Sequence, residues 1–348
     1  MNNHPTEPAY KPPFTLTEEI TGLIADIAEM TGRIEGTYAL RRNPTLRRDN
    51  RIRTIYSSLA IEHNSLSLSQ VTAVLDGKRV LAPPKDIHEV KNAYTAYEQL
   101  ERFDPCSMED LLRAHGIMMG GLVDGAGCFR SGGVGVYKGG ELIHAGTPPQ
   151  YVPEVMGQLF HWMRTSRAHP LVKGCVFHYE FEFIHPFADG NGRMGRLWHT
   201  LILSKWQPFF AWVPVESLIH DHQEGYYNAL AISDSQGEST VFIQFMLEII
   251  REALAEVSQV EETESKKDDL SGKLTGNNLP VKWTDTERAI LQRLTDDPTM
   301  TQEELAAEIG KSLRTVRNCM KRLQNAGVLR RDGARKNGKW IIQKSLDE

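Results

Sequence analysis

The twelve-residue segment His185–Arg196 constrains the fold more than any other part of the chain. It reads HPFADGNGRMGR and lies between apolar stretches at 177–184 and 197–203, so we expect a loop that joins two helices. Gly190 and Gly192 allow backbone conformations and close approaches that a side chain would block. The next helix begins here with unpaired N–H groups and the positive end of its dipole. The segment therefore predicts an anion site built from backbone.

The side chains of this segment suit polyphosphate chemistry. Arg193 and Arg196, three residues apart, share a helix face and can offer planar, permanently charged groups to a polyphosphate. Asp189 is an acid among these groups and is best explained as a ligand of Mg²⁺ shared with phosphate oxygens. His185 has a pKa near neutral pH and can take a proton from an attacking hydroxyl, while Phe187 can anchor the loop. Singly, each feature is also typical of ordinary turns and loops.

The combination resembles the signature of the Fic family, His-Pro-Phe-x-Asp/Glu-Gly-Asn-Gly-Arg-x-x-Arg, at every specified position. The resemblance covers roughly residues 40–255 and implies a mainly α fold, a helical bundle with a short β-hairpin flap. It implies transfer of AMP from ATP to a Ser, Thr or Tyr hydroxyl of a target protein, with self-modification of the enzyme. His185 would be the general base and Asp189 the ligand of Mg²⁺, or of Mn²⁺ in its place.

The resemblance also implies an ATP site and a target site. The flap around 136–145 would pair with the target backbone as an added strand, and its contact residues would be Val136, Ile143, His144 and Ala145. The two tyrosines of the implied adenine pocket are equally well explained as core aromatics. The implied ATP-binding residues are Glu62, Phe187, Gly190, Asn191, Gly192, Arg193, Gly195, Arg196, Tyr226, Tyr227 and Asp234.

An earlier segment, Ser58–Asn64, resembles the inhibitory helix motif of the family, Ser/Thr-x-x-x-Glu-Gly/Asn, with His63 where Gly or Asn is expected. Glu62 falls near a helix C-terminus, where the dipole disfavours an anion, so a cationic partner would be stabilising. Arg196 is the candidate. Pairing with Glu62 would remove the ligand of the γ-phosphate and misalign the α-phosphate for attack. The alternative is a solvated glutamate at a helix end.

With 348 residues the chain is long enough for two or three separately cored units. Helix periodicity marks about 17–62, 86–100, 108–119, 152–164, 172–183, 193–205, 224–232 and 241–257. We expect an N-terminal helical region at 1–100, with the inhibitory helix at about 47–64, and a Fic catalytic core at 101–257. Residues 258–282 are too polar to bury a core and are predicted to be a linker.

Residues 283–348 resemble a winged helix-turn-helix domain. A capping box at Thr301 and Glu304 opens one helix, Ser312–Asn325 forms the next, and 333–338 would turn a hairpin. The stretch Lys311–Lys344 carries eleven Lys or Arg residues against one acid, Asp332, a segregation that suits DNA. Winged helices also serve protein contacts, so that partner stays open. The expected DNA contacts are Ser312, Arg314, Thr315, Arg317 and Lys321.

Composition excludes other classes of protein. The polar, proline-rich N-terminus is unlike a secretory leader and no apolar run reaches the ~18 residues of a membrane span, so we expect no membrane partner. Four scattered cysteines suit reduced thiols in the cytoplasm. A homodimer is compatible with the sequence. Two other functions stay open: a DNA-binding regulator that only senses nucleotide, and removal of AMP by the same site. His185 favours an enzyme, because sensing needs no base.

Overall fold

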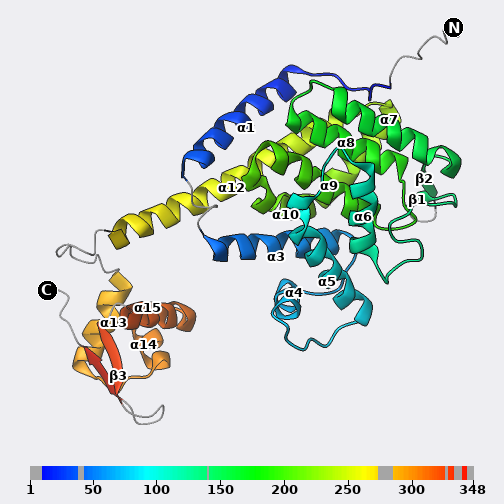
Figure 1. Cartoon of the computed structure of the whole chain (residues 1–348). Helices are drawn as coiled ribbons and strands as arrows, with labels where there is room; N and C mark the ends of the chain where they lie inside the picture. Colours follow the sequence, from blue (N-terminus) through cyan, green and yellow to red (C-terminus); the bar gives the residue numbers. More distant parts are fainter. Residues whose placement is uncertain are drawn as a thin grey trace, which may run out of the picture. The chain divides into compact units, whose positions relative to one another are not determined.

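The computed structural model describes residues 10–37, 43–138, 141–272, 285–325, 328–332 and 339–342. The chain divides into two compact units, Met1–Lys267 and Asp268–Glu348. The first unit is helical apart from one hairpin (Figure 1). Its α-helices are α1 (Glu18–Thr37), α3 (Pro44–Ile61), α4 (Leu68–Leu75), α5 (Pro84–Glu98), α6 (Met108–Met119), α7 (Val152–Thr165), α8 (Pro170–Ile184), α9 (Asn191–Trp206), α10 (Val215–Asp221), α11 (Gln223–Gln236) and α12 (Thr240–Gly272). Short 3₁₀ helices lie at Leu100–Arg102, Pro149–Tyr151 and Pro208–Trp212.

The paired helices α8 and α9 form the centre of this unit. In α8, 11 of 15 residues are buried, and in α9, 13 of 16 are buried. Helix α8 is apolar around most of its circumference, as a helix enclosed on nearly every side requires, whereas α9 also buries Arg193 and Arg196, which need polar partners inside the protein. The six-residue connection between them, 185–190, is therefore held at both ends by buried helices.

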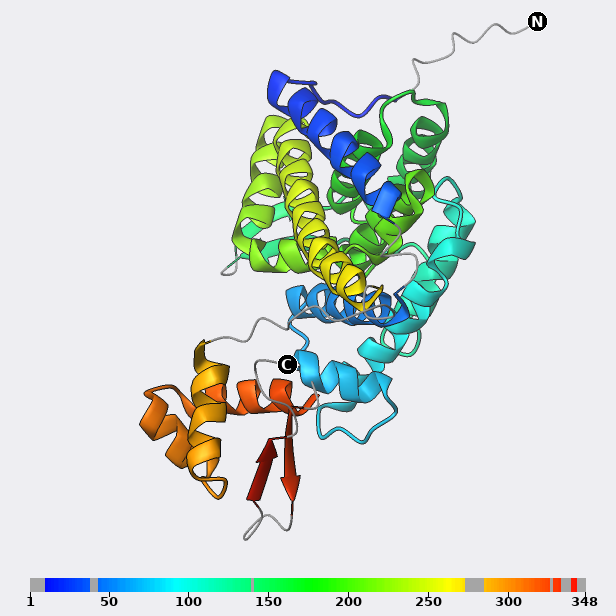
Figure 2. The ribbon, with the colours of Figure 1, turned by 90° about the vertical axis from the view of Figure 1, so that its left-hand side faces the viewer.

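The N-terminal segment is tied to the same bundle. Helix α1 runs alongside α12 (Figures 1 and 2), and Arg251 of α12 faces Asp26 of α1. Ahead of α1, the hydroxyl of Tyr10 donates to Glu180 of α8 at 2.8 Å. The carbonyl of Pro13 accepts from the amide of Ser239 at 2.9 Å.

The predicted hairpin is present. Strand β1 (Gly135–Lys138) pairs antiparallel with β2 (Glu141–Ala145), with Gly135 opposite Ala145 and an irregularity between Val136 and Tyr137. The side chains of 136–145 lie outside the described part of the chain.

Two sequence-based boundaries need correction. The helical stretch predicted at 17–62 is interrupted, because α3 begins anew after Asn43, which caps it by accepting from the Leu46 amide, with Pro44 in its first turn. The first part of the predicted linker 258–282 is helical rather than unstructured, because α12 continues to Gly272, while the division between the two units, at Lys267 and Asp268, falls within the predicted range. Its Glu and Lys residues are good helix formers, and they extend a helix that buried residues have already nucleated. Helices α4 and α10 were not predicted.

The second unit has its own hydrophobic core. Its elements are α13 (Asp285–Asp296), α14 (Gln302–Ile309), α15 (Leu313–Asn325), β3 (Leu329–Asp332) and β4 (Lys339–Ile342). Thr301 and Glu304 form the predicted capping box of α14. Strands β3 and β4 pair antiparallel; the predicted turn at 333–338 lies outside the described residues. The buried cluster includes Ile290, Leu305, Val316, Met320, Leu323 and Trp340. The predicted fold class, a helical bundle with a hairpin plus a winged helix-turn-helix, is confirmed.

Candidate active site

The loop between α8 and α9 starts and ends with left-handed residues. His185, the C-cap of α8, has φ 52°, and Gly190, the N-cap of α9, has φ 84°. Glycine adopts this conformation freely, whereas a histidine in it is strained and must be held by its surroundings. Such strain is typical of functional positions.

An aromatic stack supports the loop from inside the protein. The buried ring of Phe187 stacks on His115 of α6, with ring centroids 3.7 Å apart. The Asn191 side chain accepts from the Phe187 amide and donates to its carbonyl, both at 2.9 Å. His115 Nδ1 accepts from the Gly127 amide at 2.8 Å, so Nε2 carries the proton donated to the Asp189 carbonyl at 3.0 Å. Burial lowers the pKa of His115, which keeps this ring neutral.

A buried arginine, Arg130, holds the loop from the other side. Its guanidinium donates to four carbonyls, which join the loop to both ends of the hairpin segment: those of His185 (2.6 Å), Gly132 (2.8 Å), Ile184 (3.3 Å) and Thr147. Such an arrangement uses the fixed geometry of guanidinium donors. Arg130 could not be predicted as a functional residue, because a single arginine in a glycine-rich stretch belongs to no motif.

The imidazole of His185 is oriented by the last turn of α8. Its Nδ1 lies 3.2 Å from the Glu182 carbonyl oxygen. Since a carbonyl only accepts, Nδ1 must be the protonated nitrogen, and in the neutral ring Nε2 keeps the lone pair. This is the tautomer required of a general base that works through Nε2.

The start of α9 presents backbone amides. The first helical bond runs from the Met194 amide to the Gly190 carbonyl, so the amides of residues 191–193 have no partner within the helix. A Cβ at Gly190 would lie 2.7 Å from Sδ of Met119, so this turn is closely packed against α6. The predicted anion-binding geometry is thus available.

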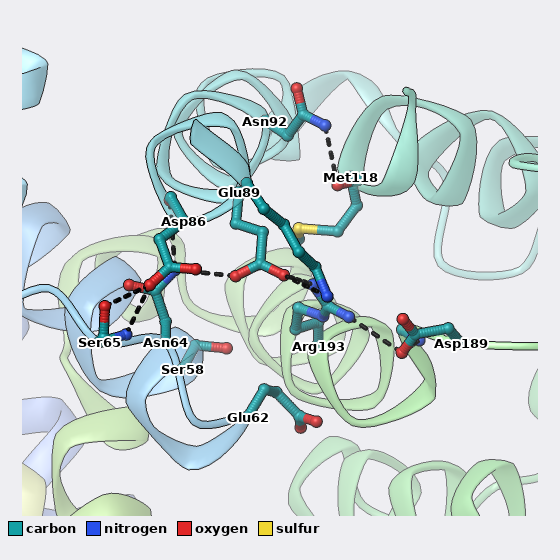
Figure 3. Close-up of polar contacts among 12 residues, drawn as sticks. Ser58, Glu62, Asn64, Ser65, Asp86, Glu89, Asn92, Met118, Asp189 and Arg193 are labelled. Carbon is teal, nitrogen blue, oxygen red and sulfur yellow. Dashed lines mark hydrogen bonds and ion pairs between the residues drawn. The ribbon is translucent and has the colours of Figure 1, made fainter. Parts of the chain in front are cut away.

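Arg193 is held between two carboxylates (Figure 3). Its Nη1 donates to Glu89 of α5 at 3.2 Å and its Nη2 to Asp189 at 3.0 Å. A cationic partner for Asp189 is therefore supplied by the protein itself. The metal predicted for Asp189, because it is an acid among positive groups, is thus not needed to balance its charge, and Glu89 was not predicted from sequence.

Arg196 is fully buried and faces the end of α3. Its Nη2 donates to Glu62 at 2.8 Å and to the Ser58 carbonyl at 2.9 Å, and its Nε donates to the Ser58 hydroxyl at 3.1 Å. Burial is the largest single influence and lowers the pKa of Arg196, but Glu62, Tyr226 and Glu182 together outweigh it, so the net pKa is raised. A Cβ at Gly192 would stand 2.3 Å from Oε1 of Glu62, so only glycine leaves room for this ion pair.

Comparisons of sequence and structure identify known proteins that are similar to this chain. A family model for the Fic/DOC family matches residues 105–203, and a model for winged helix-turn-helix DNA-binding domains matches 284–330. A Fic family protein from Desulfovibrio desulfuricans G20, whose crystal structure is known, shares 42% sequence identity with this chain. The match covers 97% of this chain and 99% of that one, with a TM-score of 0.71. The chain belongs to the Fic family.

Other Fic proteins are more distant. The chain is 28% identical over 238 residues to protein adenylyltransferase fic-1 of Caenorhabditis elegans and 27% identical over 216 residues to protein adenylyltransferase Fic of Aedes aegypti. These matches cover 64% and 58% of this chain, but only 44% and 41% of the relatives. The solved Fic-1 fragment from C. elegans, 22% identical with a TM-score of 0.59, shares the fold and covers 70% of this chain and 73% of the fragment.

Two residues predicted for the Fic nucleotide site, Gly195 and Tyr226, pack inside the helical bundle. A Cβ at Gly195 would meet Glu182 at 2.6 Å and His178 at 3.0 Å, so this glycine allows close packing of α9 on α8. Tyr226 is buried, and its hydroxyl lies 3.1 Å from Nε2 of His178, as expected of a core aromatic. By contrast, Tyr227 on α11 is 49% exposed.

The remaining predicted residues are placed mainly by their backbone. Asp234 lies in α11, Val136 lies on β1, and Ile143, His144 and Ala145 lie on β2. In the winged helix unit, Ser312, Thr315, Arg317 and Lys321 are exposed at or along α15, while the Arg314 side chain lies outside the described part. All four cysteines are described, and none forms a disulfide. Among the described helices, none combines the length and apolarity needed to cross a bilayer.

Proposed function

We propose that this Fic protein transfers AMP from ATP to a hydroxyl side chain of a protein. The observation that carries this proposal is that the imidazole of His185, in the tautomer of a base, stands on the loop that leads into amides of α9 that have no partner within the helix. The names of the curated relatives support the reaction class. The chain spans less than half the length of those relatives, so for this chain their activity is a proposal.

The phosphates would be held at the N-terminus of α9. The amides of 191–193 and the side chain of Arg193 suit the α- and β-phosphates, and Arg196 suits the γ-phosphate. A divalent ion such as Mg²⁺ fits Asp189, whose side chain is 48% exposed beside these groups. Among the described residues no cluster of three or more potential ligand side chains exists. The protein would supply one carboxylate, as magnesium sites on nucleotides commonly require, and the ion would offset phosphate charge.

In the proposed step His185 Nε2 takes the proton of the target hydroxyl. The hydroxyl oxygen then forms a bond to the α-phosphorus, the bond from that phosphorus to the bridging oxygen of the β-phosphate breaks, and pyrophosphate leaves. A target is proposed to pair with the edge of the β1–β2 hairpin, whose base Arg130 ties to His185. A chain segment of the enzyme itself could occupy the same edge and be modified.

We further propose that Glu62 inhibits the reaction. Arg196 cannot pair fully with Glu62 and with a γ-phosphate, so ATP in the parent would bind with its α-phosphate poorly aligned. Replacing Glu62 should then raise turnover more than it changes ATP affinity.

One experiment tests both proposals: α-labelled ATP with Mg²⁺, incubated with four variants and with the parent. Glu62→Gly should transfer label faster than the parent by about 10²-fold, and Glu62→Asp should give a partial increase because its arm is shorter. Arg196→Ala in the Glu62→Gly background should silence transfer. His185→Ala in that background should bind ATP and label nothing.

Other outcomes favour other functions. ATP binding with no transfer by any variant would point to a nucleotide-sensing regulator. Release of AMP from modified protein by the parent would point to the reverse reaction.

A second function is proposed for residues 283–348: binding of duplex DNA. It is supported by the winged helix match and by the exposed side chains at the start of and along α15, which are those of Ser312, Thr315, Arg317 and Lys321. Binding should weaken steeply with added salt, and Lys321→Ala should reduce the salt slope by about 1. An absence of any salt-dependent shift with duplexes, including the promoter of its own gene, would assign this unit to protein contacts.

A further inference from the structure

A chain of polar contacts leads from the end of α3 to the phosphate loop (Figure 3). Asn64, just beyond the end of α3, donates from Nδ2 to Oε2 of Glu89 at 2.8 Å. The other oxygen of Glu89 accepts from Nη1 of Arg193 at 3.2 Å. Nη2 of Arg193 donates in turn to Asp189 at 3.0 Å. The guanidinium of Arg193 on α9 thus joins α5 to the loop, and Glu89 in turn joins it to the segment after α3.

The two carboxylates on Arg193 are not equivalent. The side chain of Glu89 is 9% exposed and that of Asp189 is 48% exposed, while Arg193 itself is 4% exposed. Water or a ligand can therefore replace Asp189, whereas a guanidinium that lost Glu89 would keep a buried Nη1 without a counter-ion. Glu89, the buried partner at the rear of Arg193, is therefore fixed, whereas Asp189, the exposed partner, can be exchanged.

Neighbouring contacts keep the rear partner in place. Asn92, one turn further along α5, donates to the carbonyls of Met118 at 3.2 Å and Gly120 at 2.9 Å, which anchors α5 to the end of α6. Asp86, one turn earlier, accepts from the amide of Ser65 at 3.0 Å. The position of Glu89 is therefore set by helix packing on both sides, and the Asn64 contact sets the direction of its carboxylate.

We propose that Glu89 is a positioning residue: it fixes Arg193 beside the first amides of α9, so that a polyphosphate can take the place of Asp189. The proposal rests on the proposed function, in which Arg193 binds the α- and β-phosphates. It adds a residue of α5 to the support of the nucleotide site, and it makes the Asn64 segment that follows Glu62 part of that support. Because the guanidinium is already fixed, it loses less conformational freedom when phosphate binds, and this smaller entropic cost strengthens ATP binding.

The test compares two ligands, ATP and adenosine, by calorimetry with Mg²⁺ on the full chain. Glu89→Gln keeps the shape of the side chain and removes its charge. It should weaken ATP binding about tenfold, since Arg193, which binds the phosphates, loses the charge-assisted hydrogen bond that orients it. It should leave adenosine binding unchanged. A general loosening of the fold would weaken both ligands alike and would overturn the proposal.

Glu98→Gln is the matched control. It makes the same change on the same helix, where Glu98 faces Arg51 at 3.7 Å, without touching Arg193 or the contacts that hold Glu89. Its ATP affinity should equal that of the parent, and a loss as large as that of Glu89→Gln would overturn the proposal. In the Arg193→Ala background Glu89→Gln should have no further effect on ATP affinity; an additive loss would show that Glu89 acts by another route.

Two further outcomes are separable. If Glu89→Gln does not fold, Asn64→Asp replaces it: this variant still accepts from the Leu66 amide, but it sets an anion against Glu89 and should cause the same ATP-selective loss. Unchanged ATP affinity in Asn64→Asp would then overturn the proposal. A parent chain that binds ATP no better than adenosine contradicts the phosphate site of the proposed function. A parent preference for ATP that Glu89→Gln retains overturns only the role of Glu89.

Discussion

At the scale of single residues, His63 stands where the family motif has glycine or asparagine, and the structure shows why the motif prefers those residues. The amides of His63 and Asn64 bond to the carbonyls of Ala60 and Leu59, which is the Schellman ending of a helix, and His63 has φ 65°. Glycine or asparagine suits this conformation and histidine does not. We therefore expect His63→Gly to raise the free energy of unfolding by about 1 kcal/mol, measured by urea unfolding. His63→Ala, which keeps the strain, is the control and should not stabilise; equal gains in both variants would contradict the explanation.

The same scale shows where sequence reasoning works. Ser58, Glu62 and Arg196 could be paired from sequence because two motifs of known relation contain them, and the structure brings them within hydrogen-bonding distance. Arg130 and Glu89 could not be found, since each is a single charged residue whose partners are backbone carbonyls or residues far away in the chain. Their signal exists only once the helices are packed.

At the scale of elements, the α8–α9 pair encloses an acid. Burial raises the pKa of Glu182 to about 8; Arg196 lowers it and Glu62 raises it by smaller amounts. Its Oε1 has no hydrogen-bond partner among the described residues, and the nearby His178 is kept neutral by its own burial, which lowers its pKa. The folded chain therefore keeps a proton on Glu182 that the unfolded chain releases above its ordinary pKa of 4.5.

The pH dependence follows from that difference. Stability from this group is complete at acid pH and falls as pH rises from about 4.5 towards about 8, by up to about 1.4 kcal/mol per pH unit. Glu182→Gln cannot titrate, so its advantage over the parent in free energy of unfolding should grow between pH 5 and pH 8. Urea unfolding followed by tryptophan fluorescence at several pH values measures this difference. A constant difference across that range would mean that Glu182 is already ionised in the fold.

Element boundaries were predicted where local chemistry marks them and missed where packing decides. The capping box predicted the start of α14, and the glycines predicted the hairpin. The continuation of α12 to Gly272 did not, because its polar residues would not hold a helix by themselves and do so only as an extension of a buried one.

At the scale of the whole molecule, each unit has a core of its own. The second cluster contains Leu323, which is fully buried, and none of its members belongs to the first cluster. Leu323→Ala should cost the second unit about 2–5 kcal/mol, enough to unfold a small domain, and should abolish DNA binding. ATP affinity of the full chain should be unchanged, because the nucleotide site draws on the first unit alone. A loss of ATP affinity would show that the two units depend on each other for stability.

The burial of Arg196 links the stability of the fold to its nucleotide. A guanidinium that is 2% exposed needs a counter-ion at all times, and in the inhibited chain Glu62 provides it. Once Glu62→Gly removes that partner, the terminal phosphate of ATP becomes its replacement, so the released enzyme should unfold at a lower temperature than the parent when alone. Saturating ATP should raise its unfolding temperature by more than it raises that of the parent. If Glu62 inhibits as proposed, it supplies the counter-ion that the terminal phosphate of ATP would otherwise provide, and a chain without it depends on bound ATP to neutralise this buried charge.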